Sequence, residues 1–534
     1  MLPDSPTSFA DLTDRFKWHI PAQFNIGYAC ADAPASKAPN NPAIIDYSSD
    51  KPVMISFGAL AERSTRFAAA LSGLGIKRGD RVAIMLPQCH EAVVAHLAVY
   101  KLGAIVVPLA MQFGPEALLH RLNVAGAVAF IGDLTGTSRL SEIIDALPDL
   151  KHVVAVDASV EKAMQFEELL TNASAKFPVA NTSPDDPAMM LFTSGTTGQP
   201  KGALHGHRVL LGHLPGIQMA QGFMPQDGDK FWTPSDWAWA GGLLNALLPA
   251  LYFGVTVIAA RAPKFDPDWA VNLIKKAGIR NVFMPATAIK LMQSALENSV
   301  SLNLRTMGTA GEALGAQTLL WAKTNLGLKI NEFYGQTECN AIISACHELD
   351  VFKAGSMGKQ VPGHEVAIID ANGNALEADQ VGEIAIRQPN PVMFLEYWND
   401  FHATKDKFIG DWMLTGDRGS RNEDGYFHFL GRNDDVITSA GYRIGPSEIE
   451  DCLTAHPAVE LAAVVGKADP VRTEIVTANI MLAEGYKESR DLEVEIRTYV
   501  KSRLSAHEYP RAINFVGNVP LTESGKVIRR HFRE

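Results

Sequence analysis

The sequence predicts an α/β protein: a large N-terminal domain of parallel or mixed sheets with flanking helices, and a small mobile α+β domain at the C-terminal end. Amphipathic and apolar stretches alternate early in the chain, where 57–75 and 90–103 predict helices and "RVAIMLP" (81–87) predicts a strand. Such alternation places parallel strands in one sheet with helices on its faces. The chain of 534 residues is also too long for a single core.

The second observation is a change of character after the polar segment "GRNDDV" (431–436). Ser447 and Glu450 form a capping-box pattern for a helix that ends at Pro457, and strand-like segments follow. The stretch 491–504 then has apolar residues along one helical face. About 100 residues are enough for a separate domain. We therefore predict a large domain over 1–431, a hinge over 432–435 and a small domain over 436–534.

Composition excludes several classes of protein. A net charge of −11 argues against a nucleic-acid-binding protein, which would normally show a basic face. The five cysteines are odd in number and widely spaced without a C-x-x-C pair, so neither a disulfide framework nor a zinc site is indicated. The first 18 residues lack the basic and apolar regions of a signal peptide. These features favour a cytoplasmic protein.

One apolar segment, 238–260, is uncharged and long enough to cross a bilayer. Asn245, Pro249 and Gly254 interrupt it, and "VTVIAA" (255–260) switches to β-branched residues. A buried helix, a turn at Gly254 and a buried strand explain this pattern better than a membrane span.

The stretch "TSGTTGQPKG" (193–202) concentrates glycines, hydroxyl side chains and Lys201 directly after the apolar run "AMMLF" (188–192). Glycine allows backbone N–H groups to converge on an anion, so the loop is typical of a phosphate site. It is not the P-loop of NTPases, which has Gly-Lys-Ser/Thr at the start of a helix. Alone, such a loop could equally be a plain turn.

Four later segments also concentrate polar residues. "NEFYGQTECN" (331–340) follows a strand-like segment, "WMLTGDRGS" (412–420) places Asp417 in a Gly-bounded turn, "GRNDDVITSAGYRIGPSEIE" (431–450) carries two arginines, and "PLTESGKVIRR" (520–530) holds Lys526. Each alone has an ordinary structural explanation, such as a turn cap for Asp417 or a solvated tail for Lys526. His205 and His207 form H-x-H without a third ligand nearby, so we expect them to line the space between the loop and the next helix.

In this order, the five segments resemble the adenylate-forming superfamily of acyl-CoA synthetases, adenylation domains and luciferases over nearly the whole chain. "FKWHIPAQFNIGYAC" and "WTPSDWAWAGG" are most similar to its medium-chain acyl-CoA synthetase branch. The resemblance implies that a carboxylate attacks the α-phosphate of ATP to form an acyl-adenylate, and that coenzyme A then takes the acyl group as a thioester.

The resemblance also implies the nucleotide site. Thr337 would contact the α-phosphate, Glu338 would bind Mg²⁺, which prefers oxygen ligands, and Asp417 would accept the ribose hydroxyls. Lys526 and Arg443 would be catalytic, with Lys526 bridging the carboxylate and the α-phosphate. The remaining ATP-binding residues would be Thr193, Ser194, Gly195, Thr196, Thr197, Gly198, Lys201, Gly311, Glu312, Ala313, Glu332, Phe333, Tyr334, Gly335, Gln336 and Arg432, with Tyr334 stacked on adenine.

For the thioester step, the resemblance implies that the small domain rotates about Asp434. A different face of that domain then replaces Lys526. The residues expected at coenzyme A, whose phosphates need cations, are Gln112, Ala440, Gly441, Tyr442, Arg472, Lys501, Tyr509, Pro510 and Arg511.

We expect Trp237, Trp239, Gly335 and Cys339 to line the acyl pocket. These residues offer no cation for a second carboxylate, so the acid is expected to be a short- or medium-chain monocarboxylic acid. An enzyme that loads a carrier protein and an aromatic-acid CoA ligase remain alternatives. The expected partners are the acid, ATP and coenzyme A, without nucleic acid or a membrane span, and the sequence does not indicate the oligomeric state.

Overall fold

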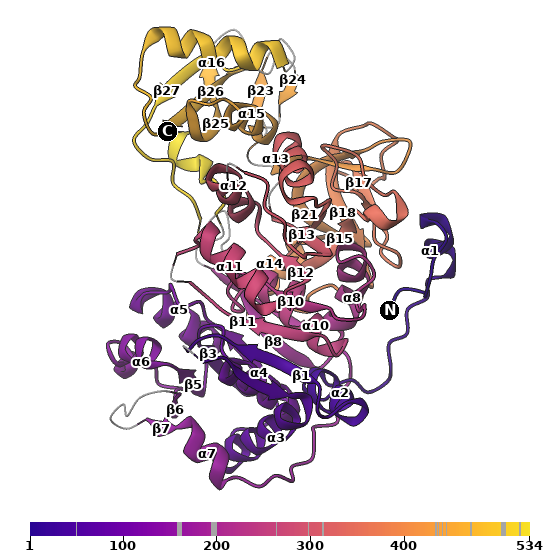
Figure 1. Ribbon diagram of the computed structural model, residues 1–534, viewed down its shortest axis with the longest axis vertical. Helices are drawn as coiled ribbons and strands as arrows, with labels where there is room; N and C mark the ends of the chain where they lie inside the picture. The colour runs from indigo at the N-terminus through magenta and orange to yellow at the C-terminus, as the bar shows by residue number, and fades with distance from the viewer. Residues whose placement is uncertain are drawn as a thin grey trace.

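The computed structural model describes the chain except residues 50, 157–162, 194–199, 263, 297, 312–313, 433–434, 436, 440–441, 445, 470–472, 504–508, 523–524 and 534, and except the side chains of Glu116, Arg432, Thr438, Tyr442, Arg443, Ser447, Glu448, Thr473, Ser502 and Arg503. Figure 1 shows the C-terminal elements from β23 onward as a separate layer above the rest of the molecule. The predicted fold class is confirmed. The domain limits at 431 and 436 stay a prediction.

An eight-stranded sheet contains the first strand–helix cycles and runs in the order β19-β9-β8-β4-β3-β5-β6-β7. Its strands from β8 to β7 are parallel, whereas β9 pairs antiparallel with both β8 and β19. The bounds are β3 Arg81–Met85, β4 Ile105–Pro108, β5 Ala129–Gly132, β6 His152–Ala155, β7 Met164–Gln165, β8 Pro187–Thr193, β9 Lys201–Gly206 and β19 Glu396–Tyr397.

A nine-stranded sheet follows the order β16-β15-β14-β13-β12-β10-β11-β1-β2, parallel from β14 to β1 with antiparallel strands at both edges. The bounds are β1 Pro42–Asp46, β2 Val53–Ser56, β10 Lys230–Trp232, β11 Thr256–Ala259, β12 Asn281–Phe283, β13 Thr306–Thr309, β14 Ile330–Gln336, β15 Cys339–Ser344 and β16 Lys359–Gln360.

Helices fill the space between these two sheets. The largest apolar core joins α3, α4 and α8 to strands of both sheets, because these helices are buried on several faces. The helices of this part of the chain are α1 Phe9–Arg15, η1 Tyr28–Asp32, α2 Ala33–Lys37, α3 Phe57–Gly73, α4 His90–Leu102, α5 Pro115–Ala125, α6 Leu134–Ser141, η2 Ile144–Ala146, α7 Phe166–Asn172, α8 Arg208–Ala220, α11 Pro267–Ala277, α12 Ala286–Ala295, α13 Ala316–Trp321, η4 Ala322–Leu326 and η5 His347–Leu349.

A third sheet, in the order β17-β18-β21-β20 with β22 beside β21, is antiparallel and holds Asp417. Its bounds are β17 Val366–Ile369, β18 Gly382–Arg387, β20 Phe408–Ile409, β21 Trp412–Arg421 and β22 Phe427–Arg432, with helix α14 (Phe401–Asp406) between β19 and β20.

The C-terminal sheet has a core of its own, whose buried residues all lie between Ile437 and Val500. The elements are β23 Ile437–Ser439, β24 Tyr442–Ile444, α15 Pro446–Thr454, β25 Val459–Asp469, β26 Thr473–Leu482, α16 Arg490–Arg503, β27 Ala512–Phe515 and η6 Arg529–Phe532. Contacts also join this part to the rest, since Lys290 Nζ of α12 lies 3.9 Å from Asp451 Oδ1 of α15.

The apolar segment 238–260 forms a bent helix of three pieces, a turn at Gly254 (φ +73°) and strand β11, as the sequence predicts. The pieces are α9 Ala240–Gly242, η3 Leu243–Leu247 and α10 Leu248–Tyr252. In the described part of the chain, no helix combines the length and the hydropathy that a membrane span requires.

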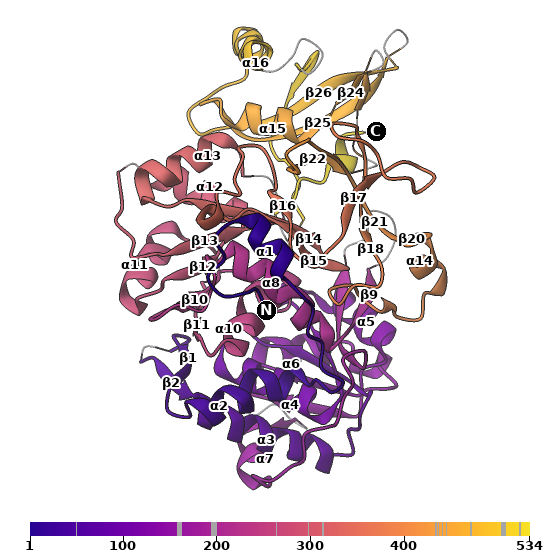
Figure 2. The same cartoon turned by 90° about the vertical axis from the view of Figure 1, so that its right-hand side faces the viewer.

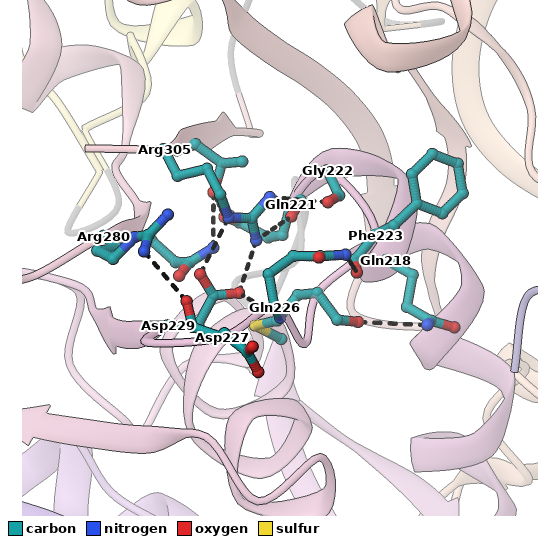
Figure 3. A network of polar contacts seen from close by, with 12 residues as sticks. Gln218, Gln221, Gly222, Phe223, Gln226, Asp227, Asp229, Arg280 and Arg305 are labelled. Atoms are coloured by element: carbon teal, nitrogen blue, oxygen red, sulfur yellow. Dashed lines mark hydrogen bonds and ion pairs between the residues drawn. The ribbon is translucent and has the colours of Figure 1, made fainter. Parts of the chain in front are cut away.

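A polar network fixes the end of α8 against the start of β13 (Figure 3). Arg305 donates to both carboxylate oxygens of Asp229, at 2.9 and 2.6 Å, and to the carbonyl oxygen of Gly222 at 2.7 Å. The N-terminal segment packs on the same helix: Leu2 N–H donates to Gln218 Oε1 at 2.8 Å, and Figure 2 shows α1 in front of α8. Bidentate arginine pairs impose a defined geometry, so α8 has a fixed position.

Candidate active site

The hairpin of β14 and β15 carries eight consecutive predicted residues, from Glu332 to Cys339. Gln336 pairs with Cys339, which leaves Thr337 and Glu338 at the turn, and the register shifts between Tyr334 and Gln336. A Cβ atom on Gly335 would lie 2.3 Å from the backbone nitrogen of Ala341. Glycine is therefore required where the strands approach most closely.

Helix α8 supports this hairpin from behind. A Cβ on Gly216 would lie 2.4 Å from the Ala341 carbonyl oxygen, and one on Gly212 would lie 2.4 Å from Val392 N. The helix backbone therefore packs directly on the hairpin and on the segment before β19. Helix α8 therefore connects the network around Arg305 to the hairpin through close packing.

Asp417 lies in the middle of the ten-residue strand β21, so the turn predicted from its flanking glycines is wrong. Gly416 has φ +76°, a conformation that glycine adopts inside the strand without turning the chain back. The carboxylate of Asp417 is 6% exposed and accepts hydrogen bonds from Tyr334 Oη at 2.5 Å and Gln336 Nε2 at 3.4 Å. Burial and the neighbouring Asp417 raise the pKa of the Tyr334 hydroxyl well above its usual value, so it stays a donor.

A lysine enters this cluster without a signal in the sequence. Lys407, after α14, donates from Nζ to Gln336 Oε1 at 3.3 Å and to the Leu414 carbonyl at 3.0 Å. The contact joins residues 71 positions apart. Lys407 fixes the amide orientation of Gln336, whose nitrogen then faces Asp417.

Glu338 is 6% exposed, and its carboxylate oxygen Oε1 accepts a hydrogen bond of 2.5 Å from Tyr397 Oη. Phe394 N–H also donates to the carbonyl oxygen of Glu338 at 2.9 Å. Sequence reasoning missed Tyr397, although "EYWND" (396–400) is an aromatic and acidic cluster in a loop region.

The predicted phosphate loop connects the paired strands β8 and β9, with Thr193 opposite Lys201. Residues 194–199, and with them Ser194, Gly195, Thr196, Thr197 and Gly198, lie outside the described residues. Lys201 Nζ lies 3.3 Å from Asp400 Oδ2 and 5.5 Å from the centre of the Tyr397 ring. The lysine is thus held on the same side as Glu338, through elements far apart in the sequence.

His205, in β9, and His207, directly before α8, are both fully buried. Their predicted place between the loop and this helix stays a prediction, because residues 194–199 lie outside the described residues. Burial lowers the pKa of His205 to about 3 and that of His207 to about 4, so both imidazoles are neutral. His205 also faces the backbone of Thr337. His205 is thus neutral polar packing beside the hairpin, whereas His207 Nδ1 accepts a hydrogen bond from Ile26 N–H at 3.1 Å.

Glu332 and Phe333 precede the hairpin on β14. Glu332 Oε1 accepts from Leu314 N–H at 2.9 Å, and burial raises the pKa of this carboxyl to about 6. Phe333 packs against Phe283 with ring centres 5.7 Å apart. Gly311 lies beside this region with φ +92°, while Glu312 and Ala313 fall outside the described residues.

The side chain of Lys526 is exposed at a tight turn. Thr522 N–H donates to the Lys526 carbonyl at 2.7 Å, Lys526 N–H donates to Thr522 Oγ1 at 3.0 Å, and Leu521 bridges to Val527. Three residues later, Arg529 donates to both oxygens of Glu450, at 2.8 and 2.6 Å. Arg529 also donates to Asp435 at 2.8 Å, which links the base of this turn to the predicted hinge.

Three residues predicted at coenzyme A come together around one ring. Lys501 Nζ lies 5.4 Å and Arg511 Cζ 5.0 Å from the centre of the Tyr509 ring, and Arg511 Nη1 donates to Tyr509 Oη at 3.2 Å. Pro510 lies between Tyr509 and Arg511, and Gln112 is exposed in the turn after β4. Two cations beside an aromatic ring form a surface suited to a phosphorylated nucleotide.

Several predicted positions have no described side chain. Asp434, Ala440, Gly441 and Arg472 lie outside the described residues. For Arg432, Tyr442 and Arg443 the structure gives the backbone alone, with Arg432 opposite Asp417 in the pairing of β21 and β22. Their roles stay predictions.

The residues predicted to line the acyl pocket pack in different parts of the core. Trp237 is 3% exposed in the core between the two large sheets, Trp239 contacts Phe113 edge-on at 5.7 Å, and Cys339 packs with Tyr334. Burial raises the pKa of the Cys339 thiol above its usual range. A common acyl pocket for these residues stays a prediction.

Two family models match this chain, one over its large N-terminal part and one over its C-terminal part. The model of the AMP-binding enzyme matches residues 31–398, and that of the AMP-binding enzyme C-terminal domain matches residues 448–526. The chain belongs to the AMP-binding enzyme family. It is 34% identical over 529 residues to the human acyl-coenzyme A synthetase ACSM2B, mitochondrial, covering 96% of this chain and 91% of that protein.

Two solved structures show the same fold over nearly the whole chain. The acyl-CoA synthetase of Brucella canis is 32% identical with a TM-score of 0.76, covering 98% of both chains. The anthranilate CoA ligase AuaEII, solved with anthranoyl-AMP, is 25% identical with a TM-score of 0.88, covering 96% of this chain and 97% of that one. The family member described here is thus an acyl-CoA synthetase, a ligase that forms AMP.

Proposed function

We propose that this acyl-CoA synthetase activates a short- or medium-chain monocarboxylic acid through an acyl-adenylate and transfers it to coenzyme A in the cytoplasm. The observation that supports the proposal most is the β14–β15 hairpin. It presents Glu338 at its turn and holds Asp417 through Tyr334 and Gln336. Two buried carboxylates in fixed orientation suit the two ends of one bound ATP, its ribose and its metal-bound phosphates.

In the proposed first step, a carboxylate oxygen of the acid attacks the α-phosphorus of ATP, and pyrophosphate leaves as the P–O bond breaks. Asp417 accepts the ribose hydroxyls, and Thr337 contacts the α-phosphate. Lys201 and the loop 193–198 neutralise the leaving pyrophosphate. Lys526 stabilises the charge on the reacting carboxylate and α-phosphate, as positioned cations do in transition states of this kind.

A magnesium ion fits the donor chemistry of the site. The carboxylate of Glu338 supplies the hard oxygen ligand that Mg²⁺ prefers, and its buried turn keeps that oxygen in place. When bound, Mg²⁺ would neutralise phosphate charge. Glu338 is the one protein ligand that we assign to it.

In the proposed second step, the thiol of coenzyme A loses its proton to solvent and its sulfur attacks the acyl carbon. The bond from that carbon to the phosphate oxygen breaks, and AMP leaves. Lys501 and Arg511 around Tyr509 favour free coenzyme A over a carrier protein, because a carrier protein does not present the nucleotide end. The residues 440–443 would line the channel for the pantetheine arm.

The chain-length expectation depends on how much of the acid's apolar chain the pocket buries. Each further buried methylene contributes about 0.8 kcal/mol, or roughly fourfold in affinity. We therefore expect acids of about four to eight carbons to exceed acetate in kcat/KM. A larger side chain at Gly335 does not test this expectation, because its Cβ would lie 2.3 Å from the backbone nitrogen of Ala341.

The decisive experiment measures pyrophosphate release for a panel of linear, branched, aromatic and dicarboxylic acids, with and without coenzyme A. The proposal expects release with apolar monocarboxylic acids and thioester formation only when coenzyme A is present. A preference for acetate or for aromatic acids would overturn the substrate class. Acyl transfer to a phosphopantetheinylated carrier protein but not to coenzyme A would overturn the acceptor.

A further inference from the structure

Tyr397 connects two charged groups of the site that belong to distant parts of the chain. It lies in the two-residue strand β19, opposite Ala203 of β9. Trp398 N–H donates to the carbonyl oxygen of Gly202 at 2.7 Å. Because Lys201 is the first residue of β9, Tyr397 is attached by backbone hydrogen bonds directly beside the lysine.

The hydroxyl of Tyr397 lies against the carboxylate of Glu338. It donates to Glu338 Oε1 at 2.5 Å, and both side chains are nearly inaccessible, at 7% and 6% exposure. A hydroxyl that donates to an ionised carboxylate forms a short and strong bond. The segment before Tyr397 holds the same residue by its backbone, since Phe394 N–H donates to the Glu338 carbonyl at 2.9 Å.

The ring of Tyr397 faces the ammonium group of Lys201. Nζ lies 5.5 Å from the ring centre, within the range of a cation–π contact, and 3.3 Å from Asp400 Oδ2. Asp400 is itself fixed, because its Oδ1 accepts from Ala403 N–H at 2.9 Å as the N-cap of α14. One short segment, 397–400, therefore determines where both Lys201 and Glu338 lie.

An ordinary packing role explains the ring but not the hydroxyl. Tyr397 belongs to an apolar cluster and its ring lies 4.9 Å from that of Phe394, so phenylalanine would fill the same space. A buried hydroxyl lowers stability unless it is hydrogen-bonded. Its partner here is the carboxylate at the turn of the hairpin, and this points to orientation of that carboxylate.

We propose that Tyr397 is a positioning residue that couples Glu338 to Lys201. Its hydroxyl holds one oxygen of Glu338 and directs the other toward the metal–nucleotide, while its ring keeps Lys201 beside the same phosphates. The inference rests on the proposed function, because the roles of Glu338 and Lys201 toward ATP belong to it. Residues that orient a metal ligand typically change metal affinity or activity by about 10- to 100-fold.

Tyr397→Phe tests the hydroxyl alone, because it retains the ring beside Lys201. Mn²⁺ serves as the probe, and its binding in the presence of ATP is followed by electron paramagnetic resonance without the acid, so that no turnover is needed. We expect the Mn²⁺ affinity of the ATP complex to fall about 10- to 100-fold. The Mg²⁺ concentration for half-maximal pyrophosphate exchange should rise by the same factor, with the KM for the acid unchanged.

Tyr426→Phe is the matched control. Tyr426 also donates from its hydroxyl, to the Asp350 carbonyl at 3.3 Å, and also has a lysine over its ring, Lys359 at 4.7 Å. This variant should bind Mn²⁺ as the wild type does. Tyr397→Leu, which removes the ring as well, should raise the KM for ATP a further three- to thirtyfold, the range of one cation–π contact.

The coupling is overturned if Tyr397→Phe binds Mn²⁺ with wild-type affinity, whatever happens to turnover. It is also overturned if Tyr397→Phe and Tyr426→Phe weaken Mn²⁺ binding equally. Failure of the proposed function has a different signature, because the wild type would then release no pyrophosphate with any acid. The Mn²⁺ measurement on the ATP complex would still compare the variants in that case.

Discussion

The carboxylates of the site and its predicted catalytic lysine are held in opposite ways. Asp417 and Glu338 are each 6% exposed, and each accepts a 2.5 Å hydrogen bond from a tyrosine. Lys526 is exposed at the tip of a turn, and the firm contacts lie three residues away at Arg529. A buried carboxylate needs hydrogen-bond donors to remain charged, whereas an exposed lysine keeps its charge in water. The two carboxylates are therefore oriented by the fold itself, whereas the exposed lysine suits the prediction that it serves only one of the two steps.

The largest effect that would test this comparison comes from Lys526→Ala. Loss of a cation at the reacting groups should reduce adenylation, measured by pyrophosphate exchange, by about 10³-fold. Thioester formation from supplied acyl-adenylate should fall less than threefold, because the lysine is expected to act only in the first step. Equal losses in both half-reactions would show that Lys526 supports the whole structure.

Asp434→Pro sharpens the comparison at the predicted hinge, a position outside the described residues. Proline fixes φ, so rotation of the small domain should be blocked. The predicted site residues on either side of the hinge are left unchanged by the substitution. We expect thioester formation to fall about 10²-fold, with pyrophosphate exchange within a few-fold of wild type. Normal overall turnover would show that Asp434 is not the hinge.

Tyr334→Phe tests how the buried carboxylate of Asp417 is oriented. The substitution removes the 2.5 Å hydrogen bond to Asp417 and leaves the ring in place. A hydrogen bond to a charged group contributes about 1.5 kcal/mol, which corresponds to roughly a tenfold rise in the KM for ATP. Transfer to coenzyme A from supplied acyl-adenylate should not change. A KM equal to that of the Tyr426→Phe control would mean that Asp417 is oriented by other groups.

The sequence predicted what is local and missed what is brought together by folding. The helices α3 and α4, the hairpin residues and the cations around Tyr509 all appear as patterns within about twenty residues. Tyr397 lies 59 residues from Glu338, and Lys407 lies 71 from Gln336, so no spacing links them. Asp417 shows the same limit, because glycine neighbours indicate a turn unless the pairing strands are known.

The smallest expected effect concerns Glu332, whose carboxyl pKa is raised to about 6 by burial on β14. An unfolded glutamate ionises near pH 4.5, so between pH 4.5 and 6 the folded state binds more protons than the unfolded state, and stability falls as pH rises. The loss is complete about one pH unit above the folded pKa, near pH 7, and is constant from there. Glu332→Gln can still accept the Leu314 N–H bond but does not titrate. The variant should therefore gain about 1 kcal/mol of unfolding free energy relative to wild type between pH 4.5 and 7. This value is discounted because the side chain is partly exposed.

Denaturant unfolding of both proteins at pH 4.5, 6 and 7.5 measures this difference. A gap that is the same at all three values would show that Glu332 is as acidic in the folded protein as in water, and that the nucleotide side tolerates a charged carboxylate there without cost.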